Sequence, residues 1–445
     1  MHNTHSKTGE IPLLFTWADE YEEIFRDGYA VSGKIISVST LQCDASMLTI
    51  HQPEIIVREN ETVLQAKFEC GNTNDVLWFS TTNEFGGYLC NERGDAFLVA
   101  MLLYAMKRGE NIHILAPISE RLYYTLTRHF VKVIADMFPR YHQIQIIGDI
   151  DSGNIDNAGG VGTGFSCGID SFCTVIEHTD KSCPPDYKLT HLTFFNVGAS
   201  GDYGGDHSRD LFHKRIDTVR PCADELKLPL VTLDSNINEI LDMNFVSTHT
   251  YRNVAAVLAL QKLFKTYYYS SSDSLWQFKL TSEASGYYDI YGLNMLSTND
   301  TQFISSGEIY SRVEKTKIVS KHPLSYKYLN VCVAADKNCS RCLKCQRTLV
   351  TLDLLGKLDL YNNVFDLNDY QMHRSKYFGL VLSGRKNDAF KQEIYDVIKR
   401  DNFSIPSCAY LYRYPQAIFQ LGMRHCPEFI VRQYRNLKRH RILNS

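Results

Sequence analysis

Residues 161–176 read VGTGFSCGIDSFCTVI, and this stretch decides how the rest of the chain is interpreted. A short β-forming pattern ends in a loop of the form S-x-G-x-D-S, and apolar residues at helical spacing follow the loop. The loop consists of Ser166, Cys167, Gly168, Ile169, Asp170 and Ser171. Small residues let backbone N–H groups approach phosphate oxygens, and a helix N-terminus adds partial positive charge. The stretch predicts a phosphate-binding loop, with a plain turn between strand and helix as the alternative.

The polar residues of this loop have distinct candidate roles. The hydroxyls of Ser166 and Ser171 are donors for phosphate oxygens. The carboxylate of Asp170 could hold Mg²⁺, or it could order the loop as the N-cap of the following helix.

Strand and helix patterns alternate after the loop. Strand patterns occupy residues 191–197, 229–234 and 264–271, and helix patterns occupy residues 210–227 and 252–264. Short apolar strands alternating with amphipathic helices are typical of βαβ units, whose strands are parallel. We therefore predict an α/β fold with a doubly wound parallel sheet over residues 156–325.

Three further regions flank this predicted domain. Residues 1–155 predict an α+β domain, with a mostly antiparallel sheet over 12–82, a helix over 95–108, and a strand, a helix and a strand over 111–148. Residues 326–356 hold a cysteine cluster that leads into a helix ending at Gly356, a residue typical of C-caps. Residues 357–445 predict a mostly helical extension.

The cysteine cluster has the spacing C-x6-C-x2-C-x2-C. Its members are Cys332, Cys339, Cys342 and Cys345. At the chain's own cysteine frequency a stretch of this length would hold about 0.4 cysteines, so chance clustering is a poor explanation. Four thiolates complete the tetrahedral shell of a structural zinc ion, and they also suit an iron–sulfur cluster. The pattern favours a structural Zn²⁺ site, a zinc knuckle, with the iron–sulfur cluster as the alternative.

Composition excludes several classes of protein. The chain has 445 residues, of which 44% are hydrophobic and 22% charged, as in ordinary globular proteins. Its net charge of −3 argues against binding to nucleic acid through overall charge. The longest apolar run, residues 96–106, is shorter than the roughly 20 residues of a membrane-spanning helix. The first ten residues show no signal-peptide core, so we expect a cytoplasmic protein with reduced thiols and no membrane contact.

Taken together, the loop and the cysteine quartet resemble one family of enzymes. The loop is similar to the S-G-G-x-D-S loop of N-type ATP pyrophosphatases, the PP-loop superfamily. Followed by the quartet, it resembles the 7-cyano-7-deazaguanine synthases of queuosine biosynthesis, the QueC-like enzymes. Weaker similarities in this sequence are His207-x-x-Asp210-Leu211, Tyr251-Arg252-Asn253 and the stretch from Arg312 to Thr316. The resemblance covers about residues 158–355.

One position of the loop departs from that family, because Cys167 stands where the family has glycine. A cysteine in the left-handed backbone region costs about 1 kcal/mol, so we expect an ordinary φ here. We interpret the thiol as a small filler beside phosphate, with a reactive thiol as the alternative.

The resemblance implies a set of roles for residues of this chain. It implies an ATP site made of Ser166, Cys167, Gly168, Ile169, Asp170, Ser171, Arg252 and Asn253. Catalysis would fall to Asp170, Ser171 and Lys315, whose ammonium would neutralise the leaving pyrophosphate. His207 and Arg252 would contact the substrate, with a structural histidine and a surface ion pair as the alternatives.

The resemblance also implies a reaction. A ligase of this type uses ATP and Mg²⁺ to adenylate a deazapurine carboxylate, 7-carboxy-7-deazaguanine, and passes it to ammonia or to a protein amine. Alternatives are a PP-loop amidotransferase or thiolase acting on tRNA or a sugar, and a degenerate scaffold that only binds nucleotide. The oligomeric state stays open, with a homodimer as one option.

The extensions suggest where a larger partner would bind. With these extensions the chain resembles the QueC-like proteins of antiphage defence operons of the CBASS type. That resemblance implies a protein acceptor encoded nearby. We expect residues 1–155 and 357–445 to recognise it, with Glu20 and Glu22 as exposed positions. Basic residues of the tail and a tyrosine cluster could also contact nucleic acid, although a solvated helix and core packing are the simpler interpretations. These residues are Arg432, Arg435, Lys438, Arg439 and Arg441, and Tyr410, Tyr412 and Tyr414.

Overall fold

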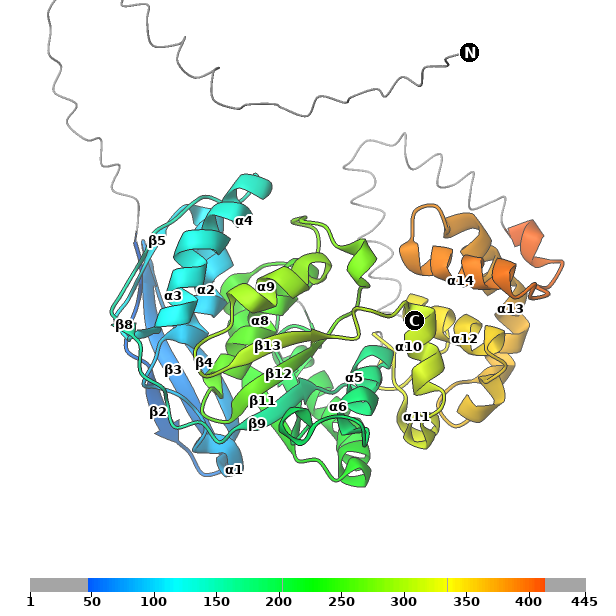
Figure 1. The fold of residues 1–445 in the computed structure, drawn as a ribbon, viewed down its shortest axis with the longest axis horizontal. Helices are drawn as coiled ribbons and strands as arrows, with labels where there is room; N and C mark the ends of the chain where they lie inside the picture. Colours follow the sequence, from blue (N-terminus) through cyan, green and yellow to red (C-terminus); the bar gives the residue numbers. More distant parts are fainter. Residues whose placement is uncertain (1–46, 202, 334, 413–445) are drawn as a thin grey trace, which may run out of the picture. The chain divides into compact units, whose positions relative to one another are not determined.

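The computed structural model describes residues 47–201, 203–333 and 335–412, which belong to one compact unit beginning at Ala45 (Figure 1). Expectations for residues 12–46, for Tyr414 and for the basic tail from Arg432 onward lie outside the described residues.

Five parallel strands form the half of the sheet that carries the loop. They are β9 (Gly160–Gly164), β10 (His191–Asn196), β11 (Leu230–Ser235), β12 (Phe264–Ser270) and β13 (Gln302–Ser306). Their order is β13-β12-β9-β10-β11, so β9 has a later neighbour on each side. This is the order of a doubly wound sheet, and the direction of winding reverses between β9 and β12.

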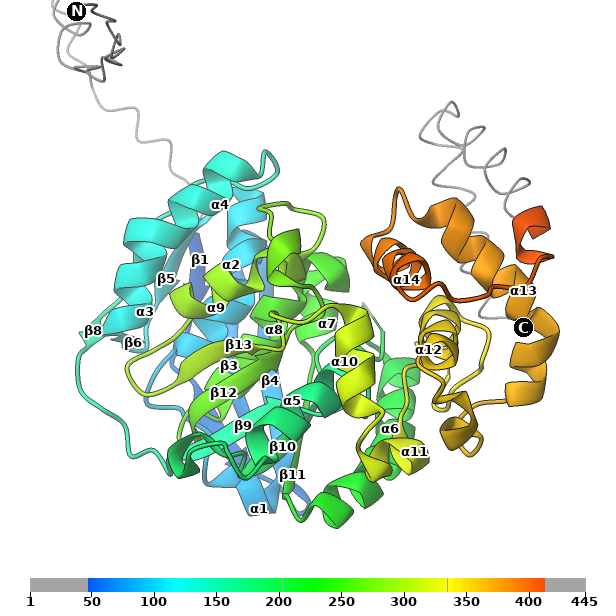
Figure 2. The ribbon, with the colours of Figure 1, turned by 45° about the vertical axis from the view of Figure 1, so that its right-hand side comes forward.

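Helices cover both faces of this half of the sheet. The connecting helices are α5 (Ile169–Thr179), α6 (Asp206–Leu226), α7 (Ile237–Leu241), α8 (Phe245–Ala259) and α9 (Asp289–Met295), with 3₁₀ turns η2 (Pro185–Tyr187), η3 (Leu275–Gln277) and η4 (Ser285–Tyr288). Consecutive residues of β12 point to opposite faces, so Tyr267 packs in the core with α8 and Tyr268 packs in the core with α5. The expected α/β class with a mostly parallel central sheet is confirmed (Figure 2).

The N-terminal strands extend the same sheet. The antiparallel pairing of β4 (Thr73–Thr82) with β11 joins the two halves, and Leu233 lies opposite Thr81. The sheet continues through β3 (Glu61–Cys70), β1 (Met47–Ile50), β5 (Asn111–Ile114) and β7 (Ile146–Ile147), and β2 (Glu54–Val57) pairs with β3. The short strands β6 (Ile118–Ser119) and β8 (Ile150–Asp151) form a separate pair. Strands from before and after residue 155 therefore belong to one sheet.

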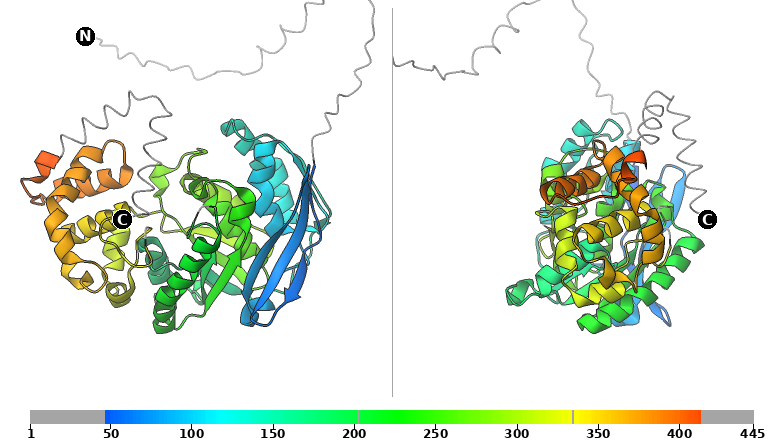
Figure 3. Two further views of the ribbon diagram at one scale, coloured as in Figure 1. Left: turned by 180° about the vertical axis from the view of Figure 1, so that it is seen from behind. Right: turned by 90° about the vertical axis from the view of Figure 1, so that its right-hand side faces the viewer.

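The N-terminal helices share a core with the second half of the fold. These helices are α1 (Asn83–Gly86), α2 (Asp95–Arg108), α3 (Glu120–Thr125) and α4 (Val131–Met137), with a π-helical turn (Leu126–Phe130) between the last two. The predicted helix over 95–108 is confirmed. Helix α2 packs between the N-terminal strands and α8, as Figure 3 shows.

Close packing against neighbouring residues explains why β9 contains glycines. A Cβ on Gly162 would lie 2.4 Å from the ring of Phe264, and a Cβ on Gly160 would lie 2.7 Å from the carbonyl oxygen of Leu263. Contacts that short are excluded, so β9 can approach β12 only without side chains at these positions.

The described chain after β13 is mostly helical, and the helical character predicted for the extension is confirmed over residues 357–412. It comprises α10 (Arg312–Val319), α11 (Pro323–Tyr328), α12 (Leu343–Leu354), the 3₁₀ turn η5 (Leu358–Tyr361), α13 (Leu367–Gly384) and α14 (Ala389–Arg400). Helix α12 begins after Cys342, and Gly356 follows its end with a left-handed φ of 62°. Helices α13 and α14 pack against α12.

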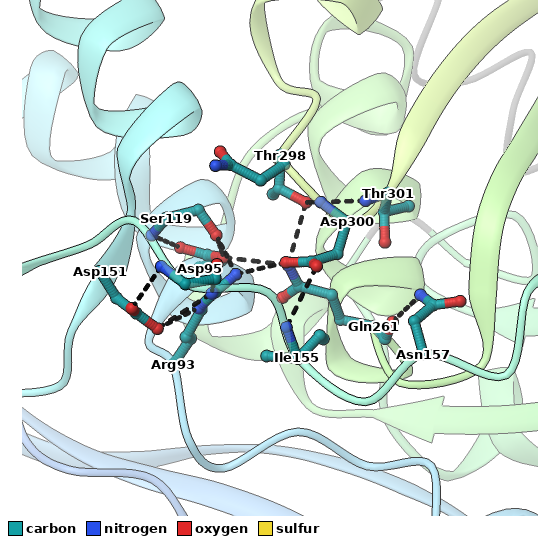
Figure 4. Close-up of polar contacts among 12 residues, drawn as sticks. Arg93, Asp95, Ser119, Asp151, Ile155, Asn157, Gln261, Thr298, Asp300 and Thr301 are labelled. Atoms are coloured by element: carbon teal, nitrogen blue, oxygen red, sulfur yellow. Dashed lines mark hydrogen bonds and ion pairs between the residues drawn. The ribbon is translucent and has the colours of Figure 1, made fainter.

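A buried ion network fastens the N-terminal segment to the parallel half (Figure 4). Arg93 is 2% exposed, and its guanidinium donates to Asp151 at 2.9 Å and to Asp300 at 2.5 Å. Asp95 accepts from the backbone N–H of Ser119 at 2.9 Å and from Gln261 at 3.2 Å. Arg93 and Asp95 precede and open α2, whereas Gln261 and Asp300 belong to the parallel half, so the network bridges the two segments.

We predict that Arg93→Met destabilises the fold by about 3–5 kcal/mol, because the change leaves buried carboxylates without their cation. The matched control is Arg58→Ala, which removes an exposed pair with Glu61 and should cost less than about 1 kcal/mol. Urea unfolding of both variants measures the difference, and a cost below about 1 kcal/mol for Arg93→Met would contradict the role of the network.

Candidate functional site

A cavity of about 660 Å³ opens at the carboxyl ends of β9 and β12. Its floor contains Ser166, Gly168 and residues 169–171 from the loop after β9, and Ser272 and Asp273 from the loop after β12. Doubly wound sheets bind ligands at this place, in the crevice where the winding direction reverses. The predicted phosphate loop therefore lies where the topology favours a binding site.

The loop presents its backbone at the start of α5. Gly168 is the N-cap of this helix, and Ser171 Oγ donates to the carbonyl oxygen of Gly168 at 3.2 Å. The N–H of Ser166 reaches Ser171 Oγ at 3.4 Å. The structure gives Asp170 no N-capping hydrogen bond, so that alternative role for its carboxylate is wrong.

The backbone at Cys167 differs from the expectation. Its φ is 57°, the left-handed region in which glycine is cheapest. The thiol is fully buried, and a hydrogen bond with Cys222 and burial raise its pKa well above the usual value. A protonated, buried thiol is a poor nucleophile, so the filler interpretation fits this geometry.

Asp170 is the anion at the centre of a cationic site. Its Oδ2 accepts from Arg312 Nη1 at 2.6 Å, and its Oδ1 accepts from Lys315 Nζ at 3.3 Å. Burial raises the pKa of the Asp170 carboxyl, but the nearby charges of Arg312 and Lys315 outweigh that effect and hold the pKa below its usual value. The carboxylate is therefore ionised and fixes both cations.

Further cations line the cavity from α12. Lys344 and Arg347 lie three residues apart on α12, and both line the cavity. The guanidinium of Arg347 lies 4.0 Å from the ring centroid of Phe390, and its Nε has no hydrogen-bond partner in the described residues. Burial, and then the charge of Arg312, lower the pKa of Arg347 to about 10. Crowded, partly unpaired cations of this kind are stabilised by a bound anion.

The charges that line the cavity are unbalanced in favour of cations. The lining cations are Arg215, Arg312, Lys344, Arg347 and Lys391, and the lining carboxylates are Asp170, Asp273 and Asp388. Lys391 pairs with Asp388 at 3.5 Å, and buried Lys315 adds a further positive charge behind Asp170. The cavity can therefore hold a multiply charged anion.

The four predicted cysteines come together beside the cavity. The sulfurs of Cys332, Cys339, Cys342 and Cys345 all lie within 4.8 Å of one another. A tetrahedral zinc ion places its sulfurs about 3.8 Å apart, and the Cys342 sulfur lies 3.5 Å from that of Cys345 and 4.0 Å from that of Cys332. The N–H of Cys342 donates to the Cys339 sulfur at 3.2 Å, as befits a thiolate. The donor set therefore fits one ion such as zinc, whereas a cubane cluster needs sulfurs spread over four irons.

This cysteine cluster also shapes the cavity wall. The segment Asn330–Val333 lines the cavity, and the N–H of Asn330 donates to the carbonyl oxygen of Cys167 at 2.8 Å. Cys342 is the N-cap of α12, the helix that carries Lys344 and Arg347. A metal in the cluster would thus fix cations of the cavity without touching a ligand there.

Several predicted site residues lie elsewhere. Arg252 is fully buried, donates to Asn238 at 2.8 Å and to the carbonyl oxygen of Met243 at 2.6 Å, and does not line the cavity. Asn253 donates to the carbonyl oxygen of His249 at 2.8 Å, and His207 is exposed on the first turn of α6. Arg252, Asn253 and His207 thus do not line the cavity, and their assignment to ATP or substrate stays a prediction, whereas the burial of Arg252 contradicts a surface ion pair. Lys315 does not line the cavity. It donates to Asp170 and, at 2.6 Å, to the carbonyl oxygen of Ser271, and it thereby positions these two residues at the cavity.

Sequence reasoning missed the wall that the C-terminal extension supplies. Helix α13 contributes Tyr377, Leu380 and Val381, and α14 contributes its N-cap Asp388 together with Phe390, Lys391 and Ile394. The available signal is the grouping of an aspartate, a phenylalanine and a lysine within residues 388–391. A further lining group is aromatic and includes Phe194, Phe245, His249, Tyr269 and Tyr287.

Comparison of the chain with protein-family models, with curated proteins and with solved structures found no significant match. Within the described residues, no helix has the length and apolar character needed to cross a membrane.

We predict that the purified protein carries about one zinc per chain, and that Cys342→Ser loses the metal and melts at a lower temperature, because metal binding contributes to folding. The control is Cys408→Ser, which changes an exposed cysteine outside the cluster and should keep the metal. Elemental analysis that finds iron and sulfide instead of zinc would contradict the assignment.

We predict that Cys167→Gly changes stability by less than about 1 kcal/mol, because relief of the left-handed backbone offsets the lost thiol packing. Cys222→Gly, which removes the partner thiol from the interior of α6, should cost at least about 2 kcal/mol. Thermal unfolding compares them, and equal costs for the two variants would contradict the backbone argument.

Proposed function

We propose that this chain is an ATP-dependent ligase of the PP-loop type, which activates a carboxylate as an acyl-adenylate and then forms a C–N bond. The observation that carries the proposal is the cation-lined cavity at the carboxyl ends of β9 and β12, with the S-x-G-x-D-S loop on its floor. A triphosphate suits this site because it offers several negative charges to the loop and to the cations that α10 and α12 bring to it.

The first half-reaction would use the two groups of cations differently. A carboxylate oxygen of the substrate attacks the α-phosphorus of ATP, and the bond to the bridging oxygen breaks, so pyrophosphate leaves. Arg312 and the loop would hold the phosphates on the Asp170 side, and Lys344 and Arg347 would face the developing charge from α12. Positioning and charge stabilisation suffice for such a step, without a covalent nucleophile.

Mg²⁺ is expected with ATP, but Asp170 gives a poor fit as its protein ligand. Both of its oxygens already accept hydrogen bonds from cations. We therefore assign Asp170 to the placement of Arg312 and Lys315 and derive no step through the metal.

The walls also suit a flat heterocyclic substrate. Phe194, Phe245, Tyr269 and Tyr287 supply aromatic faces in the same cavity as the cations. This combination supports a deazapurine carboxylate, 7-carboxy-7-deazaguanine, as the substrate. Ammonia and a protein amine are the two candidate acceptors, the second in the antiphage setting that the resemblance implies. The zinc ion of the knuckle would be structural, because four cysteines leave no open ligand position.

We predict that the wild-type protein exchanges labelled pyrophosphate into ATP only when 7-carboxy-7-deazaguanine is present. Asp170→Asn should lower the exchange rate by about 100-fold or more, because it releases two cations from their places. Arg347→Met should raise the KM for ATP by about tenfold. Lys321→Met, at an exposed position that does not line the cavity, is the control and should behave as the wild type.

Two outcomes would contradict this function. ATP binding without exchange, with this acid or with other carboxylates, would favour a nucleotide-binding scaffold. Unchanged exchange in Asp170→Asn at saturating ATP would remove the loop from the mechanism.

A further inference from the structure

Helix α14 of the C-terminal extension packs against both helices that bring cations to the cavity. Helix α10 carries Arg312, and helix α12 carries Arg347. The second residue of α14 is Phe390, whose partly exposed ring lines the same cavity as these two cations. The extension therefore adds an aromatic side chain to a group of cations that comes from other parts of the chain.

Both guanidinium groups lie over the ring of Phe390. The central guanidinium carbon of Arg347 lies 4.0 Å from the ring centroid, and that of Arg312 lies 5.3 Å from it. An aromatic face attracts a cation within about 6 Å, because the ring quadrupole is negative there. The charge of Arg312 contributes to the lowered pKa of Arg347, so the two groups repel each other. One ring therefore offsets part of the repulsion between two cavity cations.

The two guanidinium groups differ in what else holds them. Arg312 donates to Asp170 at 2.6 Å and to the carbonyl oxygen of Ser272 at 3.0 Å, so its place is fixed without the ring. The Nε of Arg347 has no hydrogen-bond partner in the part of the chain that the structure describes, and its guanidinium is the nearer of the two to the ring. Arg347 therefore depends on Phe390 for its orientation more than Arg312 does.

Phe390 stands on a firmly attached part of α14. The N-cap of the helix, Asp388, accepts from the N–H of Lys391 at 3.2 Å. One turn after Phe390, the Oε2 of Glu393 accepts from the backbone N–H of Arg312 at 2.8 Å. The ring is thus carried by a helix end that is fastened to the first residue of α10.

We propose that Phe390 is a positioning residue for the phosphate groups of ATP: its ring holds the guanidinium of Arg347 beside that of Arg312, so that both can donate to one polyphosphate chain. This inference rests on the proposed function and deepens it, because it makes the C-terminal extension part of the nucleotide site. Phe390 touches no reacting atom in this role. Each guanidinium offers a rigid set of N–H donors to phosphate oxygens, and a bound anion removes the repulsion between the two cations.

A ring in a nucleotide cavity can also stack on the adenine base, and the two roles predict different affinities. A ring that positions cations affects tripolyphosphate, which has charge but no base. A ring that stacks on the base affects adenosine, which has a base but no charge. The two cations that already lie over Phe390 favour the first role.

The first test measures the binding of tripolyphosphate and of adenosine to the full-length protein by calorimetry. Phe390→Leu keeps an apolar side chain but removes the aromatic face. We expect the Kd of tripolyphosphate to rise about fivefold and the Kd of adenosine to stay within about twofold of the wild-type value.

The matched control is Tyr395→Leu, which removes a ring of the same helix. The guanidinium of Arg385 lies 4.3 Å from the centroid of this ring, and Tyr395 does not line the cavity. The same kind of cation–aromatic contact is therefore lost away from the proposed site. Both Kd values should stay at the wild-type level in this variant.

The second test separates positioning from an effect on folding. In pyrophosphate exchange, Phe390→Leu should raise the KM for ATP about fivefold and change kcat by less than about twofold, because Arg312 keeps its own contacts. Phe390→Tyr keeps an aromatic face and should return the KM to within about twofold of the wild-type value. A variant that is partly unfolded would lower kcat instead.

Combination with Arg347→Met shows whether the ring acts through that guanidinium. In this background Phe390→Leu should raise the Kd of tripolyphosphate by less than about twofold, because the group that the ring positions is gone. A full fivefold effect in this background, an unchanged tripolyphosphate Kd in Phe390→Leu, or a loss confined to adenosine would overturn the inference. Absence of pyrophosphate exchange in a wild-type protein that binds tripolyphosphate would instead contradict the proposed function, so the two failures are distinguishable.

Discussion

The pairing of Asp170 with Arg312 and Lys315 is the constraint on which the candidate site depends. Asp170 belongs to the first turn of α5, and both cations belong to α10. Their remaining donors hold the carbonyl oxygens of Ser271 and Ser272, which follow β12. One carboxylate therefore joins the two strand ends between which the sheet reverses its winding. Without it, two cations with little exposure would repel each other, and the floor of the cavity would lose its fixed shape.

Parts of the chain far from the loop complete the site. The cysteine cluster fixes the start of α12 and thereby the cations Lys344 and Arg347. Phe390 of α14 receives the guanidinium groups of both Arg312 and Arg347 on its ring. The C-terminal extension is thus part of the cavity wall in the described residues. Its proposed use as a protein-binding surface would apply to other faces of α13 and α14.

The sequence predicted local structure better than the contacts that join distant segments. The helix over 95–108, the strands around 191–197 and 230–235, and the convergence of the four cysteines follow from periodicity and spacing. The antiparallel pairing of β4 with β11 depends on residues more than 150 positions apart, and no local pattern encodes it. The predicted helix start at Tyr251 is wrong, because α8 begins at Phe245 and places Arg252 in its buried interior. The φ expected for Cys167 is wrong, because the modest free-energy cost of a left-handed backbone is outweighed when the side chain becomes buried.

A crystal structure of the protein with a non-hydrolysable ATP analogue tests the central claim most directly. The account predicts density for the triphosphate between the backbone of residues 166–171 and the side chains of Lys344 and Arg347, with the pair of Asp170 and Arg312 intact. A nucleotide bound elsewhere on the molecule, or none in this cavity at millimolar concentration, would contradict it.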